Sequence, residues 1–236
     1  MKKSILFVCG LVLGATVVSA QEKERQTPPS HAGRVYISLQ GGPAINIYEN
    51  YFSYRENGQM AKLLTPQGAL AVGYDFSDTF GLRLQGAFGT DAGACNTRNT
   101  ATRGFYPYSF KHANAFVDAC LNLAGLMDKV TAFRPKVYLG AGGAYTFGFQ
   151  ETGTPHPWQW NNVTKSNLVF GFRGGFIAEY TLKSGLGFLL DFCAEAYTDK
   201  YNGLKPSEND QVDYEGYGGF PYDVRGLASL GIVYHF

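Results

Sequence analysis

The sequence predicts an all-β fold, an eight-stranded antiparallel β-barrel whose strands cross a membrane. Three observations lead to this prediction: apolar side chains recur at every second position in eight segments, the connections alternate between long and short, and the last strand ends on the aromatic Phe236. Because successive side chains of a strand point to opposite faces, such a period separates a lipid-facing side from a lumen-facing side.

The segments with this period follow one another from residue 34 onward. They span residues 34 to 48, 66 to 76, 80 to 90, 109 to 123, 135 to 150, 164 to 182, 186 to 199 and 222 to 236. Eight is the smallest common strand number of outer-membrane barrels, and bacterial single-chain barrels have an even number of strands. The sequence therefore predicts one closed barrel over residues 34–236.

The connections between these segments predict how the barrel is oriented. The long ones are residues 49 to 64, 91 to 108, 151 to 163 and 200 to 221, the tight ones are 77 to 79 and 183 to 185, and residues 124 to 134 are intermediate. Outer-membrane barrels have short periplasmic turns and longer extracellular loops. We therefore expect four long extracellular loops and both barrel ends on the periplasmic side.

The N-terminus predicts export. Lys2 and Lys3 precede an apolar stretch that ends before Ser19 and Ala20, so residues 1–20 read as a secretory signal peptide. Residues 21–33 then form a periplasmic leader. The formal net charge of +1 argues against a nucleic-acid partner. No later apolar run approaches the roughly 20 residues that a membrane-spanning helix needs.

The two faces of each segment differ in the same way along the chain. In the last segment Leu230, Ile232 and Tyr234 share one face, while Arg225 and His235 share the other. A soluble barrel with its apolar face inside is the alternative. Such a barrel would carry many charges outside, whereas here the mid-strand charges are few and lie with other polar residues, which favours lipid around the barrel.

A set of charged residues is expected to point into the lumen. Its members are Arg83, Asp118, Arg173, Glu179, Asp191, Glu195 and Arg225, with Asp75 and Asp223 on the same face. Charges buried in a narrow barrel are costly unless they are paired and hydrogen-bonded. Because eight-stranded barrels are usually filled, we expect a plug in which Arg173 and Arg225 bridge carboxylates. A charged, ion-selective constriction is the alternative.

No catalytic, cofactor or metal site is predicted. His112 with the nearby Ser109 is the nearest approach to a hydrolase pair, but positions on one strand do not supply a convergent triad. Cys95 is expected in a loop, and Cys120 and Cys193 are expected inside the barrel. Two small lumen-filling thiols and a disulfide are the two interpretations of that inner pair.

Aromatic residues in two expected loops suggest recognition. They are Trp158 and Trp160 in one loop, and Tyr214, Tyr217 and Phe220 in another. Exposed aromatic side chains are enriched in binding surfaces, so a host or matrix ligand is one interpretation. An aromatic girdle with loops packed on themselves is the other.

Three stretches carry a resemblance to a known family. Residues Phe110 to Leu123, Arg134 to Ala144 and Leu227 to Phe236 resemble the outer-membrane protein A-like barrels of Bacteroidota. The resemblance implies a role in envelope integrity for the barrel part, and surface adhesion as far as the loops permit. We predict a non-enzymatic barrel that supports the envelope and displays its four loops. We expect three partners: outer-membrane lipid, lipopolysaccharide, and the barrel assembly machinery acting on the strand that ends in Phe236. The resemblance extends to the barrel part only, so anchoring to peptidoglycan is not expected. A narrow diffusion pore and a lipid-modifying enzyme are the alternatives.

Overall fold

The computed structural model describes residues 30–47, 54–55, 57–96, 105–127, 131–152, 166–198, 200–203 and 222–236. The expected signal peptide and residues 21–29 of the expected leader lie outside these ranges. So do the five aromatic residues proposed for recognition, Trp158, Trp160, Tyr214, Tyr217 and Phe220.

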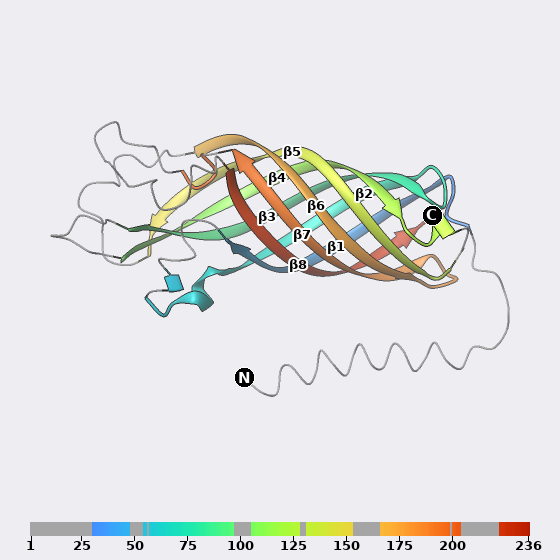
Figure 1. Ribbon diagram of the computed structural model, residues 1–236, viewed down its shortest axis with the longest axis horizontal. Coiled ribbons are helices and arrows are strands. Elements are labelled where there is room, and N and C mark those ends of the chain that lie inside the picture. Colours follow the sequence, from blue (N-terminus) through green and yellow to red (C-terminus); the bar gives the residue numbers. More distant parts are fainter. Residues whose placement is uncertain are drawn as a thin grey trace.

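The described strands form one closed antiparallel barrel, in which each strand pairs with the next and the last pairs with the first (Figure 1). They are β1 (Arg34–Asn46), β2 (Leu64–Asp75), β3 (Phe80–Asn96), β4 (Phe105–Asn122), β5 (Phe133–Glu151), β6 (Ser166–Thr181), β7 (Leu186–Thr198) and β8 (Tyr222–His235). Two short 3-10 helices, η1 (Met60–Leu63) and η2 (Gly125–Met127), lie in connections. Within the described ranges, no helix is both long and apolar enough to cross a membrane. The predicted fold class is confirmed.

The connections divide between the two ends of the barrel. Residues 76–79, 123–132 and 182–185 join strands at the end where the chain finishes, on the right in Figure 1. Strands β1, β3, β5 and β7 finish, and β2, β4, β6 and β8 begin, at the opposite end. This is the division between periplasmic turns and extracellular loops that outer-membrane barrels show.

One of the expected loops is much shorter than predicted. Strands β3 and β4 stay paired as far as Asn96 opposite Phe105, so Cys95 lies in β3 and its expected place in a loop is wrong. The alternation of large apolar residues stops after Thr90, because the apolar side chains among residues 91–96 are all small. Backbone hydrogen bonds between strands can continue beyond the bilayer without apolar side chains. The alternation of apolar residues therefore does not predict this part of β3.

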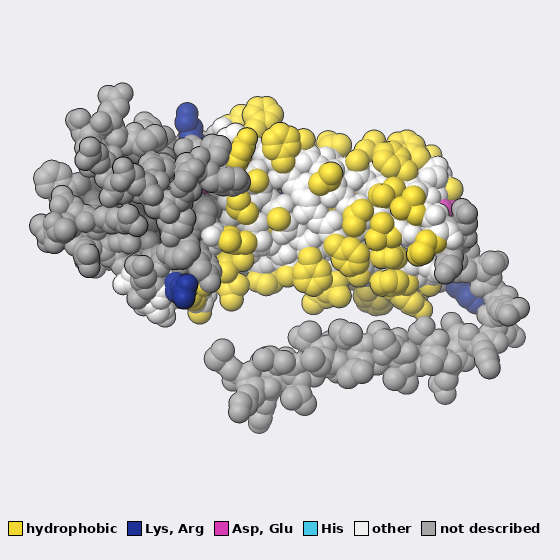
Figure 2. All heavy atoms as spheres, viewed as in Figure 1, with side chains coloured by type: hydrophobic (Ala, Val, Ile, Leu, Met, Phe, Trp, Pro, Cys, Tyr) yellow, Lys and Arg dark blue, Asp and Glu magenta, His cyan; other side chains and the backbone are white. Residues whose placement is uncertain are grey.

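The outer wall of the barrel is apolar. Leu168, Phe170 and Leu139 are 81%, 77% and 75% exposed, whereas Arg83, Asp118 and the other charged residues of the inner face are buried. Figure 2 shows hydrophobic side chains over the wall in this view, with lysine and arginine side chains only near its two ends. A continuous apolar surface of this kind needs lipid rather than water. The soluble-barrel alternative is excluded, and the protein is an integral barrel of the outer-membrane type.

At the extracellular end, part of the outer wall is covered by protein instead. The side chains of Tyr54, Leu63 and Met60 pack over Ala92, which points outward from β3. The Tyr54 hydroxyl also donates a hydrogen bond to the carbonyl oxygen of Gly93, at 3.0 Å. This small cluster marks a level at which β3 has left the lipid, because the outward face there packs against the chain itself.

Candidate functional site

The most distinctive feature of the lumen is a row of residues that lie opposite one another across six successive strands. The register pairs Arg83 of β3 with Asp118 of β4, then Gly140 of β5, Arg173 of β6, Glu195 of β7 and Arg225 of β8. We call this set the lumen row. Apart from the single glycine, positive and negative side chains alternate along it. Opposite charges facing each other across a ladder stabilise the pairing of strands.

The central part of the lumen row is organised around Asp118. Its carboxylate accepts a hydrogen bond from Arg83 Nε at 2.7 Å and two from Arg173, from Nε at 2.7 Å and Nη2 at 2.6 Å. Arg83 Nη1 donates in turn to Asp191 at 3.1 Å, and the Tyr138 hydroxyl donates to the other oxygen of Asp191 at 2.8 Å. Bidentate arginine pairs of this kind are among the strongest charge-assisted contacts in proteins.

Gly140 makes the contact between Asp118 and Arg173 possible. These two residues are separated by β5, and Gly140 is the residue of β5 that lies between them. A Cβ atom added to Gly140 would lie 2.1 Å from Asp118 Oδ1 and 2.9 Å from the carbonyl oxygen of Val117. Glycine therefore supplies the space through which the carboxylate reaches an arginine two strands away.

A second group of lumen residues, which we call the outer layer, surrounds Arg225 at the β8 end of the lumen row. Arg225 Nη1 donates to Glu195 at 2.8 Å, and its Nη2 donates to Gln67 at 2.9 Å and lies 3.2 Å from Asp91 Oδ1. His112 Nδ1 lies 3.0 Å from Asp91 Oδ2, and His112 Nε2 lies 3.1 Å from Gln67 Oε1. Both nitrogens of the imidazole therefore face protein partners inside the lumen.

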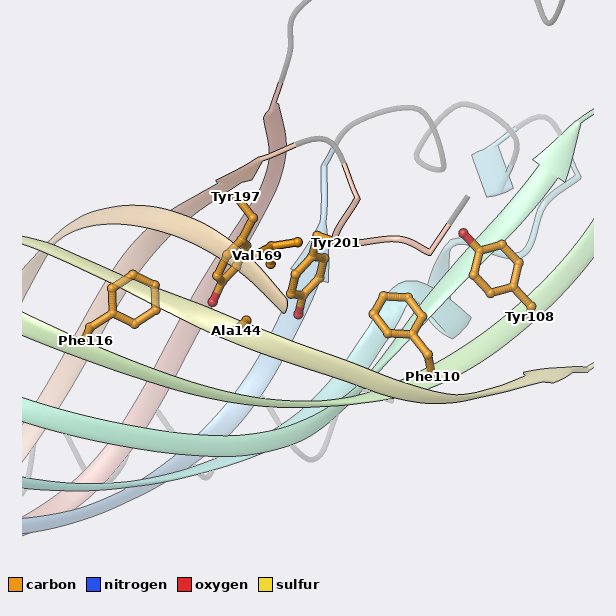
Figure 3. Packing of buried hydrophobic residues seen from close by; sticks show 7 residues of the cluster. All are labelled: Tyr108, Phe110, Phe116, Ala144, Val169, Tyr197 and Tyr201. Atoms are coloured by element: carbon orange, nitrogen blue, oxygen red, sulfur yellow. The ribbon is translucent and has the colours of Figure 1, made fainter. Parts of the chain in front are cut away.

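Aromatic rings close this outer layer toward the extracellular side (Figure 3). Tyr201, from the connection after β7, is fully buried, and its ring stacks on Tyr197 with centroids 4.3 Å apart and planes 10° apart. Phe110 meets Tyr201 edge-on at 5.6 Å, and the Tyr201 hydroxyl donates a hydrogen bond to Asp91. The start of this connection thus folds back into the barrel and places a ring over the charged residues.

A separate inner layer lies near the periplasmic end. Arg134 Nη2 donates to Asp75 at 2.8 Å, and Arg134 Nη1 donates to Glu179 at 3.1 Å. Lys136 Nζ donates to the second oxygen of Glu179 at 2.8 Å, and His235 Nε2 lies 2.9 Å from the first. Apolar and weakly polar side chains separate this layer from the lumen row, namely Tyr36, Cys120, Tyr138, Ile177, Leu189, Cys193 and Val233.

The structure places all seven residues of the expected charge network inside the barrel. Six of them are joined by ion pairs, namely Arg83, Asp118, Arg173, Asp191, Glu195 and Arg225. Glu179 instead belongs to the inner layer. Arg173 links the centre to the outer layer, where its Nη1 lies 3.8 Å from Glu195.

Sequence reasoning missed several members of these layers. Asp91 fell in an expected loop, Arg134 in an expected turn, and Tyr201 in a long connection. Lys136 could have been found, because it is in phase with the inward Tyr138 within a predicted strand. The others depend on where each strand ends, which the apolar period does not fix.

The remaining candidates are placed as follows. Cys120 and Cys193 are free thiols, so the structure favours lumen filling over a disulfide. Ser109 is half-buried and out of phase with the buried His112 on β4, so these two side chains leave the strand on opposite faces. Among the described residues, no group of histidine, cysteine, aspartate and glutamate side chains is arranged to hold a metal ion.

Comparisons with known proteins agree with this fold. No family model matches the chain, and no curated protein matches it. Among solved structures, the outer membrane protein OprG from Pseudomonas aeruginosa is 14% identical, covers 89% of this chain and 99% of its own, and gives a TM-score of 0.53. A major outer membrane protein from Thermus thermophilus is 14% identical over 86% of this chain and 99% of its own, with a TM-score of 0.50. Ail, the attachment invasion locus protein of Yersinia pestis, is 15% identical over 87% of this chain and 99% of its own, with a TM-score of 0.42. Likeness at this level is one of fold, that of an outer-membrane β-barrel.

Proposed function

We propose that this protein is a closed, non-enzymatic outer-membrane barrel that supports the envelope and displays its extracellular loops. One observation carries the proposal: the charged side chains of the lumen neutralise one another in buried ion pairs at three levels. Five arginine or lysine side chains and six carboxylates take part in the ion pairs of the described residues, with His112 and His235 beside them. Such a balance leaves little net charge with which to select ions.

The packing of the lumen also favours a plug over a pore. An ion-selective constriction needs charges that face a continuous water path. Here both arginines that contact Asp118 are buried, and the guanidinium carbon of Arg83 lies 4.2 Å from the centre of the Tyr138 ring. Tyr201 covers the outer layer in addition. The narrow diffusion pore remains the competing function, and conductance separates the two.

Single-channel recording in a planar bilayer tests the proposal. The protein would be refolded without residues 1–20, and its folding would be verified by the different electrophoretic mobilities of heated and unheated samples. We expect no current steps from folded protein. Reproducible steps would mean that a water path passes the lumen row, and the proposal of a closed barrel would be wrong.

The proposal of a non-enzymatic role is supported by the surroundings of His112. A general base needs a nitrogen within reach of the substrate proton. The His112 side chain is completely buried, and Asp91 and Gln67 lie beside its two nitrogens. We expect the lipid A mass profile of cells to stay unchanged on deletion of the protein. A mass change that returns with the wild-type protein and not with His112→Gln would instead establish an enzyme.

Lipid and lipopolysaccharide are the partners that the outer wall favours. Lys111 is exposed on the outward side of β4, opposite Thr90 and Phe147. Its stem passes the bulge at Gly148, where an added Cβ would meet its Cδ at 3.9 Å. An ammonium group at the outer rim can pair with the phosphates of lipid headgroups. Recognition of Phe236 by the barrel assembly machinery is part of the same proposal and is supported by its place at the end of the closing strand.

Surface recognition by the loops is a second candidate function, supported by the aromatic composition of residues 158 to 160 and 214 to 222. Replacing Trp158 and Trp160 with alanine is expected to weaken binding to host cells or matrix while the barrel still assembles. Unchanged binding would exclude this loop as the contact. We also propose that the protein belongs to the outer-membrane protein A-like barrels of Bacteroidota, because three of its stretches resemble that family in sequence.

A further inference from the structure

Residues Ser30–Gly33, which we call the mouth segment, are fastened to the periplasmic end of the barrel. Ser30 Oγ lies 2.9 Å from both carboxylate oxygens of Asp78, and His31 N donates to Asp78 Oδ1 at 2.9 Å. Gly33 N donates to the carbonyl oxygen of Asp75 at 2.7 Å. Gly33 has a φ of 75°, a left-handed conformation that favours glycine and turns the chain into β1.

This fastening carries His31 into a buried position. The residue is only 3% exposed, and its ring meets the ring of His235 edge-on at a centroid distance of 4.4 Å and an interplanar angle of 64°. His31 Nδ1 is buried and, among the described residues, has no hydrogen-bond partner. The ring therefore covers the inner layer on the periplasmic side, although its Nδ1 atom makes no hydrogen bond among the described residues.

The groups around His31 do not favour a positive charge on its ring. Arg134 and Lys136 of β5 and His235 of β8 supply cations or potential cations, and Tyr36 of β1 packs beside His235. The carboxylates nearby are Asp75 of β2, Asp78 of the following turn and Glu179 of β6. Asp75 and Glu179 already accept hydrogen bonds from the inner-layer cations. The positive charge of a protonated His31 would therefore be poorly compensated, because the nearby carboxylates already pair with Arg134 and Lys136.

We propose that the mouth segment is a pH-sensitive closure of the periplasmic mouth, held shut by neutral His31 and released when the His31 ring gains a proton. Release would detach residues 30–33 from the barrel and admit water to Arg134, Lys136 and Glu179. The lumen row lies deeper in the barrel and is not part of the released segment, so release opens a vestibule on the periplasmic side. The inference thus goes beyond the closed barrel proposed above and does not depend on it.

The electrostatics give the direction and the window of this switch. Burial first, and then the nearby charge of Arg134, lowers the pKa of His31 from 6.5 to about 4. Because the pKa is depressed in the closed state, the stabilising effect of His31 is complete above pH 6.5. It is lost as the pH falls from 6.5 toward 4, since the released segment binds the proton more readily.

Asp78 does not titrate in that window. Partial burial opposes ionisation of its carboxylate, but the hydrogen bonds from His31 N and Ser30 Oγ outweigh that effect and lower the pKa of Asp78 below its usual 3.8. Its contribution is therefore present above pH 3.8 and is lost only at more acidic pH. A transition between pH 6.5 and 4 thus points to a histidine.

Spin-label mobility at position 32 tests the proposal. Ala32 is exposed, so the variant Ala32→Cys accepts a nitroxide label, with Cys95→Ser added so that Cys120 and Cys193 are the other thiols. The protein, beginning at Gln21, would be refolded into phosphatidylcholine vesicles and compared with a sample that retains Ala32. We expect an immobile label at pH 8 and loss of the immobile component with a midpoint between pH 6.5 and 4. An immobile label throughout this range would overturn the proposal.

Two matched variants identify the group responsible. His31→Phe keeps an aromatic ring against His235 but cannot gain a proton, so its label is expected to stay immobile from pH 8 to 4. The same transition in this variant would mean that His235 or another group drives release, and the proposal would be wrong. Asp78→Asn is expected to give a mobile label already at pH 8, and an immobile one there would show that Asp78 does not fasten the segment.

A direct titration provides a second, independent measurement. The ring proton shifts of His31 can be followed by NMR in detergent micelles, with His31→Gln for assignment among the four histidines. We expect a midpoint well below 6.5. A midpoint at or above 6.5 would contradict the proposal even if the labelled variants failed to fold.

Discussion

Asp118 and Arg173 form a two-pronged ion pair across an intervening strand, with Nε–Oδ1 and Nη2–Oδ2 distances of 2.7 and 2.6 Å. The same carboxylate receives Arg83 from the other side. One aspartate therefore neutralises parts of two guanidinium groups and connects β3, β4 and β6. The stability of the barrel interior should depend on this residue and on the space that Gly140 leaves for it.

Gly140→Ala is expected to lower the free energy of unfolding by about 1–3 kcal/mol, the usual cost of overpacking, because its Cβ would displace the Asp118 carboxylate. Gly68→Ala is the matched control, since an added Cβ on that glycine of β2 meets nothing within 4 Å. Urea unfolding in vesicles, followed by the mobility of unheated samples on gels, measures both. Equal effects of the two substitutions would argue against the role given to Gly140.

Asp118→Asn should destabilise the barrel by about 3–5 kcal/mol, because removing one partner of a buried ion pair leaves the other charges uncompensated. Asp78→Asn makes the same chemical change in a periplasmic turn, and its effect on global unfolding is expected to be about 1 kcal/mol or less. The same unfolding measurement applies. A small effect at Asp118 would mean that water or other groups compensate Arg83 and Arg173.

Two substitutions separate the contributions of the Tyr201 ring and hydroxyl. Tyr201→Phe removes the hydrogen bond to Asp91 and should cost about 1 kcal/mol. Tyr201→Ala also removes the stack on Tyr197 and should cost about 3–5 kcal/mol. Bilayer recordings of Tyr201→Ala should remain silent because the lumen row persists. Current steps in this variant would show that the aromatic ring, rather than the row, closes the barrel.

The position of the lipid can be tested with arginine substitutions on the outer wall. Leu139→Arg, at a highly exposed site of β5, should cost about 2–4 kcal/mol if that site lies near the bilayer midplane. Thr90→Arg, directly opposite Lys111, should cost about 1 kcal/mol or less. Unfolding in vesicles compares the two. Similar costs would mean that the rim at Lys111 lies deeper in the bilayer than we infer.

The apolar period is enough to predict the strand number, the closure and the inward face of the mid-strand charges, but not of Asp91 or Arg134, which lie beyond the predicted strand ends. The reason is physical: lipid imposes the same requirement on every outward position, so the pattern repeats from strand to strand. Arg83, Arg173 and Arg225 could therefore be placed in the lumen from their phase alone.

The partners of these residues could not be predicted. Which carboxylate meets Arg173 depends on the stagger between strands and on the small residue at position 140, and neither leaves a mark in the apolar period. Asp91 and Tyr201 were missed for a related reason. Beyond the bilayer, strands continue and connections fold inward without any requirement for apolar side chains, so the period no longer reports on them.

The lumen row also has a consequence for biogenesis. Its members come from strands β3 to β8, and each charged group finds its partner on a different strand. A partly assembled sheet that entered the bilayer before those strands had joined would bring unpaired arginines and carboxylates into hydrocarbon, at a cost of several kcal/mol for each. Intermediates with an open sheet are therefore disfavoured within the lipid. We expect the hairpins to associate at the membrane surface and to cross it together, so that insertion and closure form a single cooperative step.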